Sequence, residues 1–355
     1  MKILSYRAWL EHLPLTKPYT IAYKTTYDTE VVFLEFVLDN GIVGLGASNP
    51  FEDVVGETPA QALENLQSGF LGEFIGRDIR HFNQLIDMAA QQFPDRPGTV
   101  AAVDIALHDA FGKFLGVPVL EFYGKKVEPL PTSITIGIKP VEEMVEEART
   151  YRARGFRRLK IKTGLDVDAD IERVVKLSEA FGDTMKIRVD ANQGYGWEQL
   201  RRFIRSTSHL GLELIEQPLP SGKEGELTTL PAAERQLLVA DESLINARSA
   251  LQWSQQPQPF GVYNIKLMKC GGVKGAFDIA NIARQAGISL FWGCNDESIV
   301  SISAALHAAY ACPNTRYLDL DGSFDLAHDL VSGGFRLSDG ILYPTAEPGF
   351  GYRNL

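Results

Sequence analysis

Five charged residues recur along the chain at nearly constant intervals of 28, 26, 25 and 25 residues: Lys162, Asp190, Glu216, Asp241 and Lys266. Each closes a short apolar run, such as KIRVD or LELIE. Three carboxylates that meet in one pocket provide the hard oxygen ligands that Mg²⁺ prefers. Two lysines that flank such a cation can remove and return a proton. The spacing therefore predicts metal-assisted acid–base chemistry.

The elements that position these residues follow from the same spacing. A period of about 25 residues is one strand plus one helix of a β/α barrel, and barrel enzymes place their chemistry at the C-terminal ends of strands. No helical pattern follows the last strand, so we expect a (β/α)8-type barrel in a modified, β7α form. Eight apolar runs predict its strands at 132–138, 158–162, 186–190, 212–216, 237–241, 262–266, 288–293 and 315–320.

The first third of the chain has a different pattern. Residues 2–15 alternate in the manner of a strand, and 31–48 predicts two strands joined by a turn at Asn40-Gly41. Helical patterns follow at 59–74, 81–93 and 98–116, the last rich in small residues. We therefore expect an α+β capping domain over 1–125 and a catalytic barrel over 126–334. The turn-rich segment 335–355 is expected to return onto the cap.

The composition is that of an ordinary globular enzyme. The chain has 355 residues, of which 45% are hydrophobic and 23% charged, with a net charge of −10. This balance argues against nucleic acid as a partner. The start has no apolar core of a signal peptide, no run of 18 apolar residues occurs, and the three cysteines form no CxxC pair. We therefore expect a cytoplasmic protein that does not engage a membrane.

Lys160 and Lys162 are two residues apart on one predicted strand, so both side chains lie on its interior face. Buried lysines are costly unless they bind a ligand. Lys160 is expected to bind a substrate carboxylate or to depress the pKa of the neighbouring lysine base, together with the cation. Asn192 is a candidate to orient a metal ligand or a metal-bound water, with a plain turn role left open. Lys269 and Lys274 are predicted to be solvated.

Over nearly its whole length the chain resembles the enolase superfamily, muconate-lactonising subgroup. The resemblance implies that Lys162 and Lys266 are the acid/base pair and that Asp190, Glu216 and Asp241 are Mg²⁺ ligands. It leaves open a homo-oligomer and does not fix the number of subunits. The motifs that carry it are K-x-K at Lys160–Lys162, DAN at Asp190–Asn192, IEQP at Glu216–Pro218, ADES at Asp241–Ser243 and NIKLMKCGG at Lys266.

The eighth predicted strand ends in YLDLDGS, which puts Asp319 and Asp321 two residues apart and on one face. With a metal held elsewhere, an inward acidic pair suits a substrate ammonium group. The pair is similar to that of dipeptide epimerases, where it holds the α-ammonium of the substrate. Thr135 matches a family position that contacts substrate. Two alternatives stay open: Asp321 in the turn before Gly322, and Thr135 as a plain strand residue.

The sequence thus predicts a Mg²⁺-dependent dipeptide epimerase. It would invert the α-carbon of the C-terminal residue of L,L-dipeptides by 1,1-proton transfer between two lysines, through an enediolate that the cation stabilises. N-acylamino acid racemase, o-succinylbenzoate synthase and muconate cycloisomerase activities are alternatives on the same scaffold. Their substrates lack a free α-ammonium, so Asp319 and Asp321 disfavour them.

The preferred side chains are expected to depend on two loops of the cap, at 20–30 and 49–58, and on a residue after the seventh strand. Epimerases that prefer L-Ala-L-Glu resemble this chain in a cationic residue near position 24, so Lys24 in the first loop leaves this substrate open, more weakly because lysine lacks the bidentate fork of arginine. Glu52 and Asp53 in the second loop, with Asp296, form an acidic rim better suited to Lys- or Arg-containing dipeptides. The cationic dipeptide is our hypothesis and L-Ala-L-Glu the alternative. Glu57 also lies in the second loop.

Overall fold

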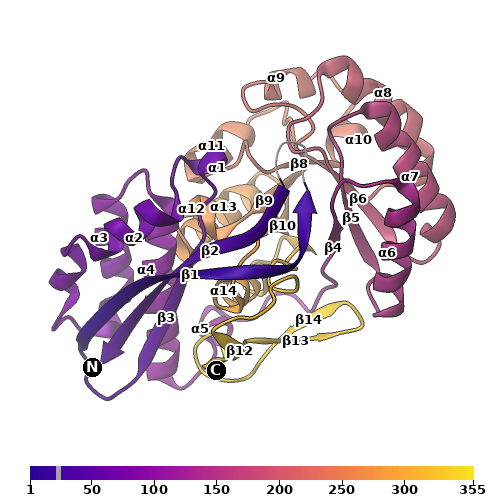
Figure 1. Cartoon of the computed structure of the whole chain (residues 1–355). Coiled ribbons are helices and arrows are strands. Elements are labelled where there is room, and N and C mark those ends of the chain that lie inside the picture. The colour runs from indigo at the N-terminus through magenta and orange to yellow at the C-terminus, as the bar shows by residue number, and fades with distance from the viewer. Residues whose placement is uncertain (21–24) are drawn as a thin grey trace.

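The computed structural model describes residues 1–20 and 25–355 of the chain (Figure 1). Its N-terminal part is an antiparallel sheet of three strands, β1 (Ile3–Thr20), β2 (Thr25–Leu38) and β3 (Val43–Ser48), in that order. The predicted turn at Asn40-Gly41 joins β2 to β3, and Gly41 has a φ of 84°, which glycine adopts without strain. The first two strands form a long ribbon that reaches from the cap toward the barrel (Figure 1).

The long helix of the cap lies directly on the sheet. A Cβ atom at Gly46 would stand only 2.0 Å from the carbonyl oxygen of Ala102, and one at Gly44 would stand 2.3 Å from that of Ala106. The small residues on both elements permit this close packing, as the alanine-rich sequence predicts. The helical elements of this part are α1 (Glu52–Val55), α2 (Pro59–Gln67), η1 (Phe70–Phe74), η2 (Ile79–His81), α3 (Phe82–Gln92), α4 (Pro97–Leu115) and α5 (Val119–Tyr123).

Strand β2 is buried on both of its faces. Val31 and Phe33 point into the core that is shared with the barrel, whereas Val32 and Leu34 point into the core beneath the helices of the cap. The alternation follows from the two-residue period of a strand. Because one strand contributes to both cores, the cap sheet has a fixed position relative to the barrel.

The rest of the chain forms the barrel, and all eight predicted strands are present. Thr132 bridges Leu318, and the Ser133 N–H donates to the Leu318 carbonyl at 3.0 Å, so the first strand meets the last and the ring closes. The parallel strands pair in sequence order as β4 (Ile134–Ile136), β5 (Arg158–Lys162), β6 (Lys186–Asp190), β7 (Leu214–Glu216), β8 (Leu238–Ala240), β9 (Val262–Ile265), β10 (Ser289–Trp292) and β11 (Thr315–Leu318).

The barrel helices pack their apolar sides on these strands. In α7, Val174, Leu177 and Phe181 are buried at helical spacing, while Glu172 and Lys176 face solvent. The helical elements are α6 (Val141–Ala153), α7 (Val167–Phe181), α8 (Trp197–Thr207), η3 (Ser208–Leu210), α9 (Glu224–Leu227), α10 (Ala232–Arg235), α11 (Ala247–Trp253), α12 (Leu267–Cys270), α13 (Val273–Gln285) and α14 (Ile299–Tyr310).

The C-terminal segment runs back to the N-terminal sheet. Its strands β12 (Val331–Gly333), β13 (Phe335–Ser338), β14 (Ile341–Pro344) and β15 (Tyr352–Asn354) pair as β12–β15 and β13–β14. The Tyr352 hydroxyl donates to the Leu45 carbonyl, and the Phe350 N–H donates to Asp109 Oδ1 at 3.1 Å. These bonds connect the chain end to β3 and α4.

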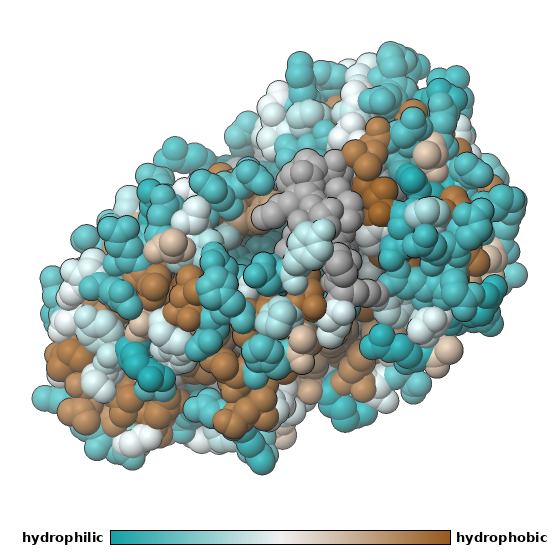
Figure 2. Space-filling view, viewed as in Figure 1, coloured by the Kyte–Doolittle hydropathy of each residue, from teal (hydrophilic) through white to brown (hydrophobic). Residues whose placement is uncertain are grey.

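No helix among the described residues is long and apolar enough to span a membrane. On the face shown in Figure 2, hydrophobic side chains gather over the cap, and hydrophilic ones predominate over the barrel. Leu4 and Ile75 are two exposed apolar residues of the cap.

Candidate active site

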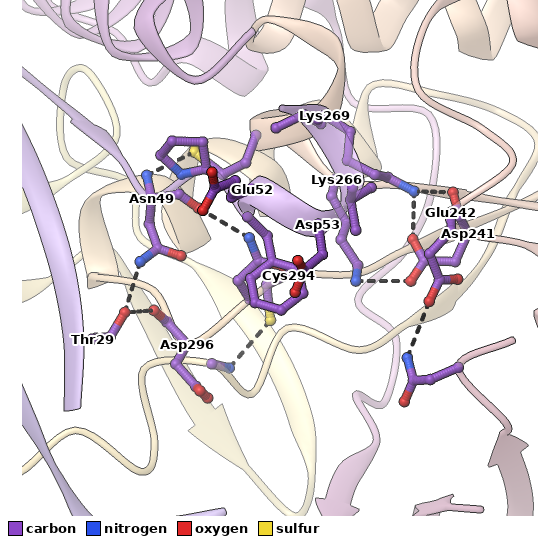
Figure 3. A pocket seen from close by; sticks show the side chains of 18 of the residues that line it. Thr29, Asn49, Glu52, Asp53, Asp241, Glu242, Lys266, Lys269, Cys294 and Asp296 are labelled. Atoms are coloured by element: carbon purple, nitrogen blue, oxygen red, sulfur yellow. Dashed lines mark hydrogen bonds and ion pairs between the residues drawn. The ribbon is translucent and has the colours of Figure 1, made fainter. Parts of the chain in front are cut away.

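A cavity of about 460 Å³ lies at the C-terminal ends of the barrel strands, against β2 and α1 of the cap. Barrel enzymes bind their substrates at this end. Figure 3 shows part of its lining. Asp190 and Glu216 lie beneath its floor, in contact with Lys160. The other predicted site residues within the described chain all line the cavity: Glu52, Asp53, Thr135, Lys160, Lys162, Asn192, Asp241, Lys266, Asp296, Asp319 and Asp321.

The three predicted metal ligands stand side by side on consecutive strands. Asp190 and Glu216 end β6 and β7 and are register partners, and Asp241 follows β8 directly. The three residues are 0%, 1% and 2% exposed. One oxygen of each is held by a protein donor: Asp190 Oδ1 by the Asn192 N–H at 2.9 Å, Glu216 Oε1 by Asn264 Nδ2 at 2.6 Å, and Asp241 Oδ1 by Lys269 Nζ.

The second oxygen of each carboxylate contacts an inward-pointing lysine. Lys160 has the central position and lies 3.1 Å from Asp190 Oδ2, 2.8 Å from Glu216 Oε2 and 2.8 Å from Asp319 Oδ2. Lys162 Nζ donates to Asp190 Oδ2 at 2.7 Å, and Lys266 Nζ lies 2.8 Å from Asp241 Oδ2. The lysines at the two ends of the five-residue pattern, Lys162 and Lys266, thus form ion pairs with two of its carboxylates, Asp190 and Asp241.

The carboxylates are crowded enough to require a cation. Burial, and then the charge of Asp190, raise the pKa of Glu216 to about 8. Burial and the charge of Asp241 raise the pKa of Glu242 to about 7. Glu216 Oε2 contacts Lys160 but accepts no hydrogen bond from it, and Glu242 Oε2 also accepts none. Buried, like-charged oxygens of this kind are stabilised by a hard divalent cation, so the residues fit Mg²⁺.

Among the described residues, no three Asp, Glu, His or Cys side chains converge closely enough to form a metal site by geometry alone. The inner oxygens of the three carboxylates contact lysine ammonium groups instead of one another. At Asp190, burial disfavours the charged form, but Lys162 and Lys160 outweigh burial and lower the pKa to about 2. The donor set is present, and its inner oxygens are directed at the lysines.

Lys162 and Lys266 approach the cavity from different sides, because Lys162 ends β5 and Lys266 follows β9, four strands further along the ring. Burial disfavours the ammonium form of Lys266, but the contact with Asp241 outweighs it and holds the pKa above its usual value. The sequence led us to expect a depressed lysine pKa beside a cation. That expectation is for a lysine beside a bound cation, so it stays a prediction.

Asp319 and Asp321 follow β11, and both line the cavity, so the placement of Asp321 in an outer turn is not observed. Lys160 Nζ donates to Asp319 Oδ2 at 2.8 Å, and the Thr135 N–H donates to Asp321 Oδ2 at 2.8 Å. Burial, and then the nearby charge of Asp319, raise the pKa of Asp321 to about 7. A second positive group beside Asp321 would therefore be favoured.

The acidic rim is larger than the sequence predicts. Glu52 and Asp53 of α1 line the cavity, and Asp28, Glu30 and Asp325 line it as well. The two-residue period of β2 puts Asp28 and Glu30 on one face, and this alternation was a signal available in the sequence.

Two other charged residues, Lys24 and Glu57, belong to the predicted rim loops. Lys24, on which the L-Ala-L-Glu alternative depends, lies outside the described residues. Glu57 is fully buried and is not part of the rim. Its oxygens accept hydrogen bonds from the N–H groups of Gly98, at 2.7 Å, and Thr99, at 3.1 Å, at the start of α4. It thereby anchors the end of the loop that carries Glu52 and Asp53.

A chain of hydrogen bonds, the cap–barrel clasp, joins the cap to the barrel loop that carries Asp296. Asn49 Nδ2 donates to Thr29 Oγ1 at 2.7 Å, and Thr29 Oγ1 donates to the Asp296 carbonyl at 2.9 Å (Figure 3). Asn295 Nδ2 donates to the Asn49 carbonyl at 3.0 Å. The clasp brings the predicted rim residues of two separate elements to one side of the cavity.

The prediction that Lys269 is solvated was wrong. Its side chain is 5% exposed and contacts Asp241. The cause is α12, a single helical turn that begins after Lys266 and carries Lys269 back over the same carboxylate. Lys274, in contrast, is partly exposed and pairs with Asp87. Sequence reasoning also missed Glu242, which follows Asp241 directly and accepts a hydrogen bond from Asn192 Nδ2 at 3.3 Å.

Comparisons with known proteins agree with this geometry. The family model described as "Enolase C-terminal domain-like" matches residues 143–353. The model described as "Mandelate racemase / muconate lactonizing enzyme, N-terminal domain" matches residues 7–124. Together they cover most of the cap and nearly all of the barrel after its first strand, β4.

Relatives over the full length have related names. The chain is 49% identical to an L-Lys-D/L-Arg epimerase of Desulforapulum autotrophicum, covering 100% of both chains. It is 30% identical to an L-Ala-D/L-Glu epimerase of Bacillus subtilis, covering 99% of this chain and 96% of that one. A solved dipeptide epimerase from Methylococcus capsulatus, complexed with Mg and the dipeptide L-Arg-D-Lys, matches with a TM-score of 0.97 and 47% identity, covering 99% of each chain.

Proposed function

The chain belongs to the mandelate racemase and muconate lactonizing enzyme family of the enolase superfamily, and on this premise we propose that it is a Mg²⁺-dependent dipeptide epimerase that prefers Lys- and Arg-containing dipeptides. One observation carries the proposal. Asp319 and Asp321 line the same cavity as Lys162 and Lys266, so a carboxylate pair for an ammonium group faces two proton carriers. The named relatives with 47–49% identity support the cationic preference.

The binding step follows from the charges. Asp319 and Asp321 hold the α-ammonium of the dipeptide, and Lys160 between them and the carboxylate floor attracts the substrate carboxylate. Asp190, Glu216 and Asp241 would hold Mg²⁺, which stabilises the negative charge that develops on the substrate carboxylate. Asn192 orients Asp190 through its N–H.

The chemical step requires one proton carrier on each face of the α-carbon. Lys162 and Lys266 come from β5 and β9, and a dipeptide anchored at both ends would place the α-carbon of its C-terminal residue between them. One lysine removes the α-proton and the other returns a proton to the opposite face, which inverts the centre. Reversible epimerisation requires the reverse roles for the other epimer.

The charge of the cavity favours cationic side chains. Several acidic residues of the lining have no proposed role at the metal or at the α-ammonium group. They come from β2, α1 and two barrel loops. They are Asp28, Glu30, Glu52, Asp53, Asp296 and Asp325. A Lys or Arg side chain in this field gains attraction, whereas a Glu side chain is repelled.

Neutralising the predicted rim tests this preference. The triple variant Glu52→Gln, Asp53→Asn and Asp296→Asn is expected to lower kcat/KM for L-Lys-L-Arg by roughly 10- to 100-fold, since each lost charge costs about 0.5–0.9 kcal/mol. Activity on L-Ala-L-Glu should stay the same or rise. The measurement is steady-state epimerisation of both dipeptides, followed by chiral chromatography.

A matched control removes the same number of carboxylates from exposed positions elsewhere: Asp95→Asn, Glu142→Gln and Asp183→Asn. This variant should keep the wild-type ratio between the two dipeptides. Equal kcat/KM values for L-Lys-L-Arg in the rim variant and the control would show that the rim does not select the substrate.

The activity should also depend on pH through Asp321. Since burial and Asp319 raise the pKa of Asp321 to about 7, the carboxyl group of Asp321 in the free protein is neutral below that pH and charged above it. An ammonium group binds the charged form, so kcat/KM is expected to fall about tenfold per pH unit below 7. In Asp321→Asn the overall activity should be lower and this acidic limb absent. The measurement is a pH profile from 5.5 to 8.5 for both proteins, and an identical limb in the variant would refute the assignment.

The proposed activity itself is tested by NMR. The protein with Mg²⁺ in D₂O should remove the α-proton signal of the C-terminal residue of L-Lys-L-Arg and produce the L,D epimer. Persistence of that signal at high protein concentration would argue against the function.

We also propose that the chain divides at residues 125 and 334, that the protein is cytoplasmic and that it forms a homo-oligomer.

A further inference from the structure

The three proposed metal ligands, Asp190, Glu216 and Asp241, divide their oxygens in the same way. In each, one oxygen is held by a donor from the protein, and the other is directed toward the central lysines. For Asp190 the donor is a backbone N–H two residues further along the chain, which any residue provides. For Glu216 and Asp241 the donors are the side chains of Asn264 and Lys269, so the amino-acid sequence itself specifies them.

Asn264 is held in place within the barrel wall. It lies in β9, is fully buried, and donates from Nδ2 to Glu216 Oε1 at 2.6 Å. Directly after the neighbouring strand β10, a Cβ at Gly293 would stand 2.6 Å from Asn264 Oδ1 and 2.8 Å from Nδ2. The absence of a side chain at 293 thus makes the room for this amide. The side chain of Asn264 thus holds Glu216, while its backbone carbonyl accepts a hydrogen bond from Lys269 Nζ at 3.1 Å.

Lys269 uses all of its donors on the protein. Its ammonium group donates to the carboxylate of Asp241 and to the Asp241 carbonyl, the latter at 2.6 Å. Its third donor goes to the Asn264 carbonyl at 3.1 Å. Figure 3 shows Lys269 beside Asp241. An ammonium group has three N–H donors, so none is left for a substrate. Lys266, three residues earlier, contacts the other oxygen of the same carboxylate. The two lysines therefore have different tasks, and Lys269 is a positioning residue.

We propose that Asn264 and Lys269 select Mg²⁺ over Ca²⁺ by occupying one oxygen each of Glu216 and Asp241. The inference rests on the proposed function, because it assumes that Asp190, Glu216 and Asp241 bind Mg²⁺. A carboxylate with one oxygen held by the protein offers only the other to an ion. Ca²⁺ takes 6–8 oxygen ligands and accepts both oxygens of one carboxylate, whereas the smaller Mg²⁺ takes six. Holding one oxygen of each group therefore disfavours the larger ion.

The test compares the binding of Mg²⁺ and Ca²⁺ by isothermal titration calorimetry in wild-type protein, Asn264→Leu and Lys269→Met. We expect the preference for Mg²⁺ over Ca²⁺, as the ratio of the two dissociation constants, to fall about tenfold or more in each variant. Lys269→Met also removes a positive charge, which changes the affinities for both divalent ions in the same direction. The ratio cancels that effect, and Asn264→Leu carries no change of charge.

Lys274→Met is the matched control, since Lys274 is a partly exposed lysine of the neighbouring helix that pairs with Asp87. Its ratio should equal that of the wild type. Circular dichroism and thermal unfolding show which variants are folded, and Asn264→Ser and Lys269→Gln replace any that are not. A merely structural role would weaken the binding of both ions in parallel and leave the ratio unchanged, which would overturn the inference.

The failure of the proposed function gives a different result. If the wild-type protein bound no Mg²⁺, the metal site and this inference would both be wrong. If it bound Mg²⁺ and every folded variant kept the wild-type ratio, the inference alone would be wrong.

Discussion

Replacing either Lys162 or Lys266 by alanine is expected to lower the rate of epimerisation by about 10³- to 10⁴-fold, because each variant lacks the proton carrier on one face of the α-carbon. Each variant should still exchange the α-proton of one epimer, namely the one whose proton faces the lysine that remains. The two variants should therefore show opposite preferences between the L,L and the L,D dipeptide. The measurement is deuterium incorporation from D₂O, started separately from each epimer.

Lys274→Ala provides the control, as another lysine that does not line the cavity. It should epimerise both dipeptides at the wild-type rate. A Lys162→Ala protein that epimerised at nearly the wild-type rate would exclude the two-lysine mechanism. Loss of exchange from both epimers in both variants would instead point to a role for these lysines in binding.

The second large effect is expected when a proposed metal ligand, Glu216, is replaced. Glu216→Gln should lower activity at saturating substrate by at least about 10³-fold, because the amide loses the charge that a divalent cation requires. In the wild type, removal of divalent cations with EDTA should abolish activity, and added Mg²⁺ should restore it. Ligand binding to the folded state also stabilises it, by about 2.7 kcal/mol at a concentration 100 times the dissociation constant. Mg²⁺ should thus raise the Tm of the wild type and leave that of Glu216→Gln unchanged.

Glu198→Gln is the matched control, since Glu198 is an exposed glutamate at the start of α8. It should keep both the activity and the increase in Tm. An EDTA-treated wild-type protein that remained fully active would contradict the metal requirement directly.

The barrel was predictable because its signal is long-range and regular. Asp190 and Glu216 each close an apolar strand, and a constant strand–helix unit puts them beside each other in the register. The turn at Asn40-Gly41 and the helix α4 with its alanines were also predictable, since turn residues and small side chains act locally. These signals required no knowledge of how distant segments pack.

The roles of the residues that were missed depend on local geometry, which the strand–helix spacing does not specify. Lys269 resembles an ordinary surface lysine until a one-turn helix brings it back over Asp241. Glu57 resembles its neighbours Glu52 and Asp53, yet it faces the start of α4 and is buried. Asn264 lies inside the predicted strand 262–266, in which only the charged end residue, Lys266, was chosen as a candidate. In each case tertiary contacts decide the role of the side chain.

The central claim is that this chain moves the α-proton of cationic dipeptides between two lysines. The most direct test is to incubate the protein and Mg²⁺ in D₂O with a mixed library of L,L-dipeptides and to read deuterium incorporation by mass spectrometry. The account predicts a gain of about one dalton on Lys- and Arg-containing dipeptides, with inversion at the C-terminal residue, before any gain on L-Ala-L-Glu. No gain on any dipeptide, with exchange on N-acylamino acids instead, would contradict it.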